Sequence, residues 1–135
     1  MKASTLAYER RSIMLPRAAG KLMKLPEAEH AVVDAAKVRD YLLSREHAVG
    51  RFKAVFFATL GYTRDHWKRL QEDLLALGQS GTAKKIQETR FGQKYEIHGT
   101  LAGPSGRRTD VVTIWIVLHG EDFPRFVTVF PGEVR

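Results

Sequence analysis

Residues 109–118 read TDVVTIWIVL, and this stretch decides the fold class. Most of its side chains are β-branched, and Trp115 lies among them. Side chains of these kinds favour a pleated, half-buried strand. Turn sequences bound the stretch, with Gly-Pro-Ser-Gly at 103–106 and His-Gly-Glu-Asp at 119–122. The pattern therefore predicts a strand that short turns join to its neighbours in the chain.

Two further strands flank this one. Residues 93–101 alternate with a period of two, which is typical of a half-buried strand. Residues 125–130 predict the last strand, which Pro131 and Gly132 end. Three successive strands with short links predict an antiparallel meander. The short apolar run 31–33 is a candidate edge strand.

The residues before the meander have helical spacing. Apolar side chains three and four positions apart predict helices over residues 34–44, 50–60 and 63–78, the last one stopped by its glycine. The polar stretch 79–89 is interpreted as a linker. The chain is therefore predicted to be an α+β protein, with about three N-terminal helices packed on a C-terminal antiparallel β-meander of three to four strands.

Length and charge suggest one domain with a basic tail. The chain has 135 residues, and we expect residues 25–135 to form a single domain. Residues 1–24 hold six basic side chains and one acidic one, so +5 of the formal net charge of +7 lies there. We interpret them as a tail that is either disordered or upstream of a later start, at Met14 or Met23.

Cysteine chemistry and a membrane span are excluded by what the sequence lacks. There is no cysteine, which rules out disulfides and thiolate sites. No apolar run reaches the roughly 18 residues of a membrane span, so no membrane partner is predicted and a cytoplasmic location is expected. The five histidines show no i, i+4 pair, and no Walker-type glycine loop is present. Neither a metal site nor a cofactor is therefore predicted.

The corner over residues 44–53 is a candidate anion site. It joins two predicted helices and concentrates His47, Arg51 and Lys53 around a glycine. A helix N-terminus attracts phosphate through its free N–H groups and its dipole. A histidine there could transfer protons near neutral pH. The alternative is an ordinary helix–helix corner with solvated bases.

One sheet face is a candidate nucleotide clamp. If Ile97 and Ile114 face the helices, then His98, Thr113 and Trp115 share the other face of the sheet. Aromatic and imidazole rings on an open sheet can stack on bases. The alternative is a partly exposed face with a packed tryptophan.

The last strand offers two more candidates. Arg125 follows a tight turn, and an arginine can hold a phosphate with two hydrogen bonds. The alternative is a salt bridge to Glu121 or Asp122. Thr128 could offer a hydroxyl to a phosphate or serve only as a strand former.

Three stretches together carry a resemblance, namely residues 41–57, 91–106 and 113–128. In order and spacing they resemble a bacterial family catalogued as a domain of unknown function, over about residues 24–132. The genes of that family often neighbour one for a small acidic protein. Its architecture is similar to the ribonuclease toxins grouped around barnase, EndoU and the tRNA-cutting colicins.

The resemblance implies a toxin that cleaves RNA, with tRNA as one candidate target, by metal-independent transesterification. It also implies neutralisation by a small acidic antitoxin or immunity protein. The catalytic residues that it suggests are His47, Lys53, Thr113, Arg125 and Thr128. Arg51, His98 and Trp115 are the candidate substrate-binding residues, and His98 is also a candidate second acid or base.

Two other functions stay open. The chain could be a non-catalytic module that binds RNA or protein, of an immunity, antitoxin or adaptor type. It could also be a small-molecule enzyme with a pocket between helices and sheet. Nothing in the sequence indicates an oligomeric state.

Overall fold

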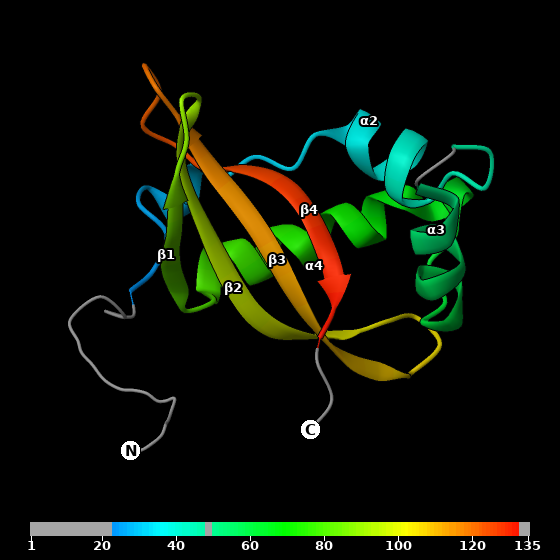
Figure 1. Ribbon diagram of the computed structural model, residues 1–135. Coiled ribbons are helices and arrows are strands. Elements are labelled where there is room, and N and C mark those ends of the chain that lie inside the picture. The colour runs from blue at the N-terminus through cyan, green and yellow to red at the C-terminus, as the bar shows by residue number, and fades with distance from the viewer. Residues whose placement is uncertain (1–22, 48–49, 133–135) are drawn as a thin grey trace.

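The computed structural model of the protein describes residues 23–47 and 50–132. The predicted tail over residues 1–24 lies outside the described residues, except for its last two. Helices come first and strands follow (Figure 1), so the predicted α+β class is confirmed. The elements in chain order are η1 (Ala28–His30), α2 (Ala35–Lys37), η2 (Val38–Leu42), α3 (Gly50–Thr59), η3 (Arg64–His66), α4 (Trp67–Ser80), β1 (Ala83–Glu88), β2 (Gly92–Ala102), β3 (Arg108–Leu118) and β4 (Arg125–Pro131).

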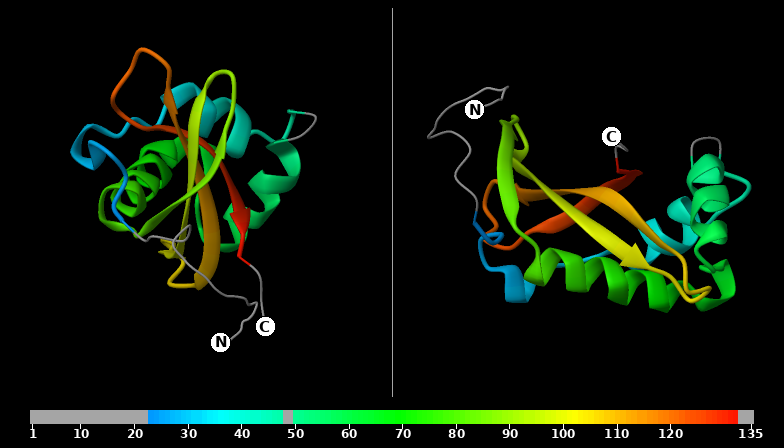
Figure 2. Two further views of the ribbon diagram at one scale, coloured as in Figure 1. Left: turned by 60° about the vertical axis from the view of Figure 1, so that its left-hand side comes forward. Right: turned by 90° about the horizontal axis from the view of Figure 1, so that it is seen from below.

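The four strands form one antiparallel sheet in the order β1-β2-β3-β4, so each strand pairs with the next one in the sequence. The sheet is strongly twisted, and α4 crosses one of its faces (Figure 2). The helices α2 and α3 lie beside β4, at the edge away from β1 (Figure 1). Helices therefore cover one face and flank one edge of the sheet.

The face toward α4, here called the core face, holds the apolar core. Ile97 of β2 pairs directly with Thr113 of β3, and both side chains are fully buried. Trp115 lies on the same face against Gly78 of α4. Because alternate residues of a strand point to opposite sides, the other face of the sheet, here called the outer face, carries the half-buried side chains Val112, Ile114 and Ile116 of β3.

This arrangement corrects the predicted face of two site residues. Thr113 and Trp115 lie on the core face, whereas His98, one residue beyond Ile97, lies on the outer face. The prediction put all three on one side and was wrong. Apolar residues occupy both faces of β3, so the strand's pattern did not reveal which face the helix covers.

Three further predictions differ from the structure. The stretch 79–89, interpreted as a linker, holds the end of α4 and all of β1. Gly78 does not stop α4, because it lies inside the helix where the Trp115 ring leaves no room for a side chain. The run 31–33 is not a strand, since only Val32 makes an isolated bridge to Arg125.

The first predicted helix is also broken into two pieces. A short α2, capped by the Asp34 carboxylate on the Ala36 N–H, passes into the π-helical turn η2. The N–H of Leu43 donates to the carbonyl of Val38, which is the five-residue spacing of a π-helix. Among the described residues, the helices are all too short or too polar for a membrane span.

Candidate functional site

Two lysines from the helical part donate hydrogen bonds to backbone carbonyls on the free edge of β4. The ammonium of Lys37 donates to the carbonyl of Val127 at 3.1 Å, and that of Lys53 donates to the carbonyl of Val129 at 2.6 Å. The two carbonyls are two residues apart on one strand, so they lie roughly 6–7 Å apart. An ammonium has three donors, so each lysine can bind an anion while it keeps its bond to β4.

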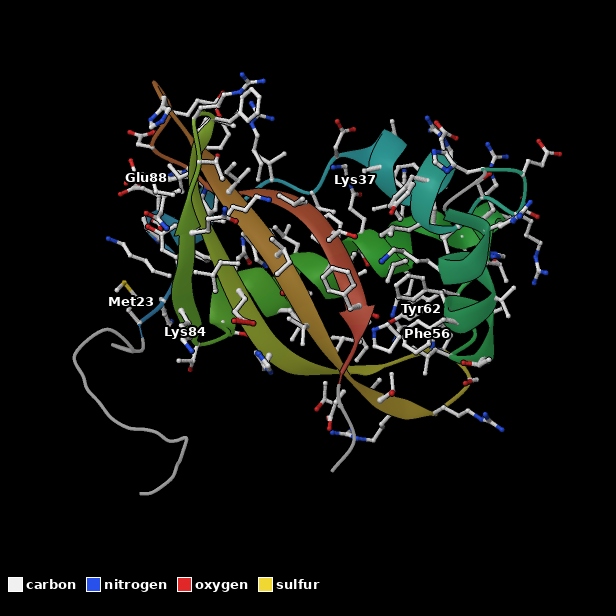
Figure 3. The ribbon with its side chains drawn as sticks, viewed as in Figure 1. Met23, Lys37, Phe56, Tyr62, Lys84 and Glu88 are labelled. Carbon is white, nitrogen blue, oxygen red and sulfur yellow. The ribbon has the colours of Figure 1, made fainter. Side chains whose placement is uncertain are left out.

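These lysines border a groove between β4, η2 and α3. The lysine groove has an open volume of about 460 Å³ and is lined by Lys37, Tyr41, Lys53, Val127, Thr128 and Phe130. Figure 3 labels Lys37 between α2 and β4. The volume falls in the usual range of small-ligand sites. The lining combines two cations, two aromatic rings and two hydroxyls, those of Tyr41 and Thr128.

Phe130 is the exposed wall of this groove. Its side chain is 46% exposed, and the Lys53 ammonium lies 4.5 Å from the centre of its ring. Partial burial lowers the pKa of Lys53, because a desolvated ammonium is less stable than a hydrated one. Lys53 is therefore a cation that gives up a proton more readily than a solvated lysine.

His47 reaches the groove through Tyr41. The two rings meet edge to face with 5.0 Å between their centres, and Tyr41 lines the groove. His47 also begins α3, because its carbonyl accepts the Arg51 N–H and its Nδ1 accepts the Gly50 N–H, each at 3.0 Å. Arg51 lies on α3 with its side chain exposed.

The structure thus places two predicted residues, Lys53 and Thr128, in one groove, and His47 contacts the groove residue Tyr41. It adds Lys37 and Tyr41, which the sequence reasoning missed. Their spacing of four residues would have placed them on one side of a helix. The signal existed, but nothing in the sequence said that this side would meet β4.

Thr113 and Trp115 do not belong to this site. Both are fully buried, and the Thr113 hydroxyl accepts the indole N–H of Trp115 at 2.9 Å while it donates to the Ile97 carbonyl at 3.2 Å. A substrate on the surface cannot touch either side chain. Their polar atoms satisfy one another inside the core.

Arg125 also lies away from the groove. Its guanidinium donates two hydrogen bonds, of 2.8 and 2.9 Å, to the Glu121 carboxylate, as the alternative interpretation anticipated. The hydrogen bond from Arg125 lowers the pKa of Glu121, and the same bond raises the pKa of Arg125. Arg125 precedes Val127, the first groove residue on β4, by two residues and is not part of the groove lining.

His98 lines a separate hollow and is not among the residues of the lysine groove. It pairs with Val112 on β3, which pairs with Phe130 on β4, so the three side chains form one row across the outer face. With neighbouring strands about 4.8 Å apart, the backbones of His98 and Phe130 are about 10 Å apart. His98 Nε2 lies 3.0 Å from Glu96 Oε2.

One group of possible metal ligands occurs among the described residues. His30 Nε2 lies 4.0 Å from carboxylate oxygens of both Glu27 and Glu29, and the three side chains are exposed. They lie on and beside η1. Exposed acidic groups of this kind are common without a metal, so the group carries no argument.

Comparison with known proteins gives a family and a fold. The family described as "Domain of unknown function (DUF6883)" matches residues 24–133. No curated protein matches the sequence. A solved chain from the "Contact-dependent growth inhibition toxin - immunity protein complex from Klebsiella pneumoniae 342" is similar in structure, with a TM-score of 0.60, 22% sequence identity, and coverage of 79% of this chain and 97% of that one. At this identity the similarity establishes the fold alone.

Proposed function

The chain belongs to this family of unknown function, DUF6883, and we propose that it is a ribonuclease-like toxin domain that cleaves RNA without a metal ion. The lysine groove is the observation that carries the proposal. Two ammonium groups held on one strand edge, with Thr128 between them, suit the anionic oxygens of a phosphodiester. The exposed ring of Phe130 beside them suits a nucleobase.

The reaction is a transesterification. A base removes the proton of the ribose 2′-hydroxyl, whose oxygen attacks the adjacent phosphorus. The bond to the 5′-oxygen breaks, and an acid protonates that oxygen. The lysines stabilise the charged phosphorane. Histidine is the natural base near neutral pH. His47 contacts Tyr41 of the groove, and His98 shares a row across the outer face with Phe130.

The biological setting is proposed as part of the same function. The structural neighbour comes from a complex that contains a toxin and an immunity protein. We expect the present chain to act on cytoplasmic RNA, with tRNA as one candidate, and to be neutralised by a small acidic protein. Acidic side chains would complement Lys37 and Lys53.

The test is an RNA cleavage assay with purified protein in EDTA. We expect the wild type to release fragments ending in a 2′,3′-cyclic phosphate. Lys53→Met should lose at least 100-fold of this activity, because it removes the ammonium and keeps the length of the stem. Lys85→Met on β1, at the opposite edge of the sheet, is the matched control and should retain full activity. Absence of cleavage by the folded wild type, checked by circular dichroism, would overturn the proposal.

A second function has one observation in its favour. The outer face of β3 carries Val112, Ile114 and Ile116, whereas the open face of an antiparallel sheet is usually polar. A non-catalytic module that binds a protein through this face would expose such residues. Binding that does not respond to salt, together with no cleavage, would favour it over the ribonuclease.

A further inference from the structure

We propose that His98 is the general base of this reaction, that Glu96 positions it, and that His47 acts as a helix cap rather than as a base. The inference rests on the ribonuclease function proposed above. It assigns the proton-transfer role, which the groove alone leaves open between the two histidines.

The contact with Glu96 determines which nitrogen of His98 can accept a proton. A carboxylate only accepts hydrogen bonds, so the 3.0 Å contact with Glu96 Oε2 requires a proton on His98 Nε2. In the neutral ring, Nδ1 then carries the lone pair. The His98 side chain is 72% exposed and that of Glu96 is 23% exposed, so the carboxylate is the more buried partner. Its contact with Nε2 orients the imidazole ring. This is the geometry of a base oriented by a carboxylate.

The contacts of His47 argue against the same role. A backbone N–H only donates, so the bond from Gly50 requires the lone pair to be on His47 Nδ1 and the ring proton to be on Nε2. A second proton would have to go to Nδ1 and would break this bond. The bond satisfies an N–H of the first turn of α3, which otherwise has no partner within the helix. The lone pair of His47 is therefore already engaged by the first turn of α3.

The position of His98 suits an attack across the outer face. The row His98, Val112, Phe130 runs toward Lys53, whose ammonium lies over the Phe130 ring. Val112 forms an apolar floor between the two polar ends. The backbones of His98 and Phe130 are about 10 Å apart, so both ends of the row lie on one stretch of the outer face.

Two other charged groups lie near the pair of His98 and Glu96. Lys84 of β1 is the cross-strand partner of Glu96. Asp110 of β3 lines the same hollow as His98, and its carboxylate accepts the Thr100 hydroxyl at 3.0 Å. Asp110 thus has its own donor, and Glu96 is the carboxylate in contact with the ring.

The 2′-hydroxyl proton passes to His98 Nδ1 while the oxygen–phosphorus bond forms. The bond between phosphorus and the 5′-oxygen breaks, and the leaving oxygen takes a proton from the Lys53 ammonium. The products are a 2′,3′-cyclic phosphate and a 5′-hydroxyl. His98 then returns its proton to water, and Lys53 regains one from water.

Cleavage of a labelled RNA by purified full-length variants tests the assignment. We expect His98→Ala to lose about 100-fold or more in kcat, the usual contribution of a general base, and added imidazole to restore part of it. His47→Asn should stay within a few-fold of the wild type, because asparagine replaces the cap. His119→Ala, an exposed turn residue, is the matched control and should retain full activity.

A double-mutant comparison distinguishes positioning of His98 by Glu96 from a purely structural role of Glu96. Glu96→Ala should lose about 10–100-fold in the wild-type background and nothing further in the His98→Ala background, since Glu96 acts only through His98. Glu96→Gln should be more active than Glu96→Ala, because the glutamine amide oxygen still accepts a hydrogen bond from the Nε2–H group of His98.

The outcomes separate the two proposals. No cleavage by the wild type overturns the ribonuclease and this assignment together. Cleavage that survives His98→Ala but is lost in a folded His47→Asn protein overturns only the assignment, and so does equal loss from Glu96→Ala in both backgrounds. Because His98 is largely exposed, its variants should fold, and thermal unfolding checks this for each protein.

Discussion

The Thr113 hydroxyl holds the middle of the core face together through two hydrogen bonds. It accepts from the Trp115 indole and donates to the Ile97 carbonyl, with all three groups buried. Thr113→Val keeps the shape and leaves the indole N–H without a partner. We expect a loss of about 1–3 kcal/mol in the free energy of unfolding, measured by urea denaturation.

Thr113→Ser provides the control, because it keeps the hydroxyl and removes only a methyl group. Both proteins should retain RNA cleavage when activity is corrected for the folded fraction, since Thr113 does not reach the surface. A Thr113→Val protein that is fully folded and inactive would contradict this structural role.

A second buried hydroxyl makes stability depend on alkaline pH. Tyr62 donates to Asp73 Oδ2 at 2.6 Å, and burial, helped by that bond, raises the pKa of its phenol well above the ordinary 10.0. The unfolded phenol therefore loses its proton first as pH rises, and the native state then binds more protons than the unfolded state. This contribution to stability is complete below pH 10.0 and declines above it.

Tyr62→Phe removes that titration and keeps the ring. We expect the difference in unfolding free energy between wild type and Tyr62→Phe to be constant from about pH 7 to 9 and to shrink above about pH 10. Urea denaturation at a series of pH values measures it. A difference that grows with pH would mean that the phenol ionises more easily in the folded protein.

At this scale the sequence indicated some of the site residues and missed others. His47, Lys53 and Thr128 stood out as a histidine, a lysine and a threonine near expected turns and edges. Lys53 and Thr128 line the groove, and His47 contacts Tyr41 of the groove. Lys37 and Tyr41 have the spacing of one helix side, but the sequence did not indicate that this side contacts β4, about ninety residues away in the chain.

Among the elements, α4 packs closely against β3 where Gly78 faces the Trp115 ring. A Cβ on Gly78 would lie 2.6 Å from Cζ2 of Trp115. We expect Gly78→Ala to destabilise the protein by about 1–3 kcal/mol, because overpacking outweighs the better helix propensity of alanine. Thermal or urea unfolding measures the change.

Glu72→Ala on the same helix is the matched control, because its side chain is exposed and alanine is again a better helix former. It should leave stability within about 0.5 kcal/mol of the wild type. A Gly78→Ala protein as stable as the wild type would mean that α4 can shift away from the Trp115 ring.

The element boundaries explain where sequence patterns were insufficient. β2, β3 and β4 could be predicted because β-branched residues and turn signals marked them. β1 could not, because five of its six side chains are exposed and its backbone is held by pairing with β2. A strand of this kind carries no alternation, so only the tertiary partner defines it.

Over the whole molecule, the edge of β4 joins the helical half to the sheet. Val32 exchanges backbone hydrogen bonds with Pro124 and Phe126, and farther along the strand two lysines take the next outward carbonyls. An unpaired sheet edge invites association with other strands. Here Val32, Lys37 and Lys53 occupy backbone groups of that edge, and the two lysines form a cationic groove beside it.

The same arrangement predicts how RNA binding responds to salt. A 2′-O-methyl oligonucleotide cannot be cleaved by transesterification, so its affinity can be measured on the active protein. If Lys37 and Lys53 each neutralise one phosphate, the slope of log K against log salt should become shallower by about 0.7 for each of Lys37→Met and Lys53→Met. Fluorescence anisotropy at several salt concentrations measures it.

Lys85→Met, at the far edge of the sheet, should leave that slope unchanged. The double variant of Lys37 and Lys53 should lower it by about 1.4, because separate phosphate contacts release counterions independently. Equal slopes in all of these proteins would place the RNA elsewhere on the molecule. The two ammoniums would then serve only to protect the edge of β4, and the outer face of β3 would become the stronger candidate for a binding surface.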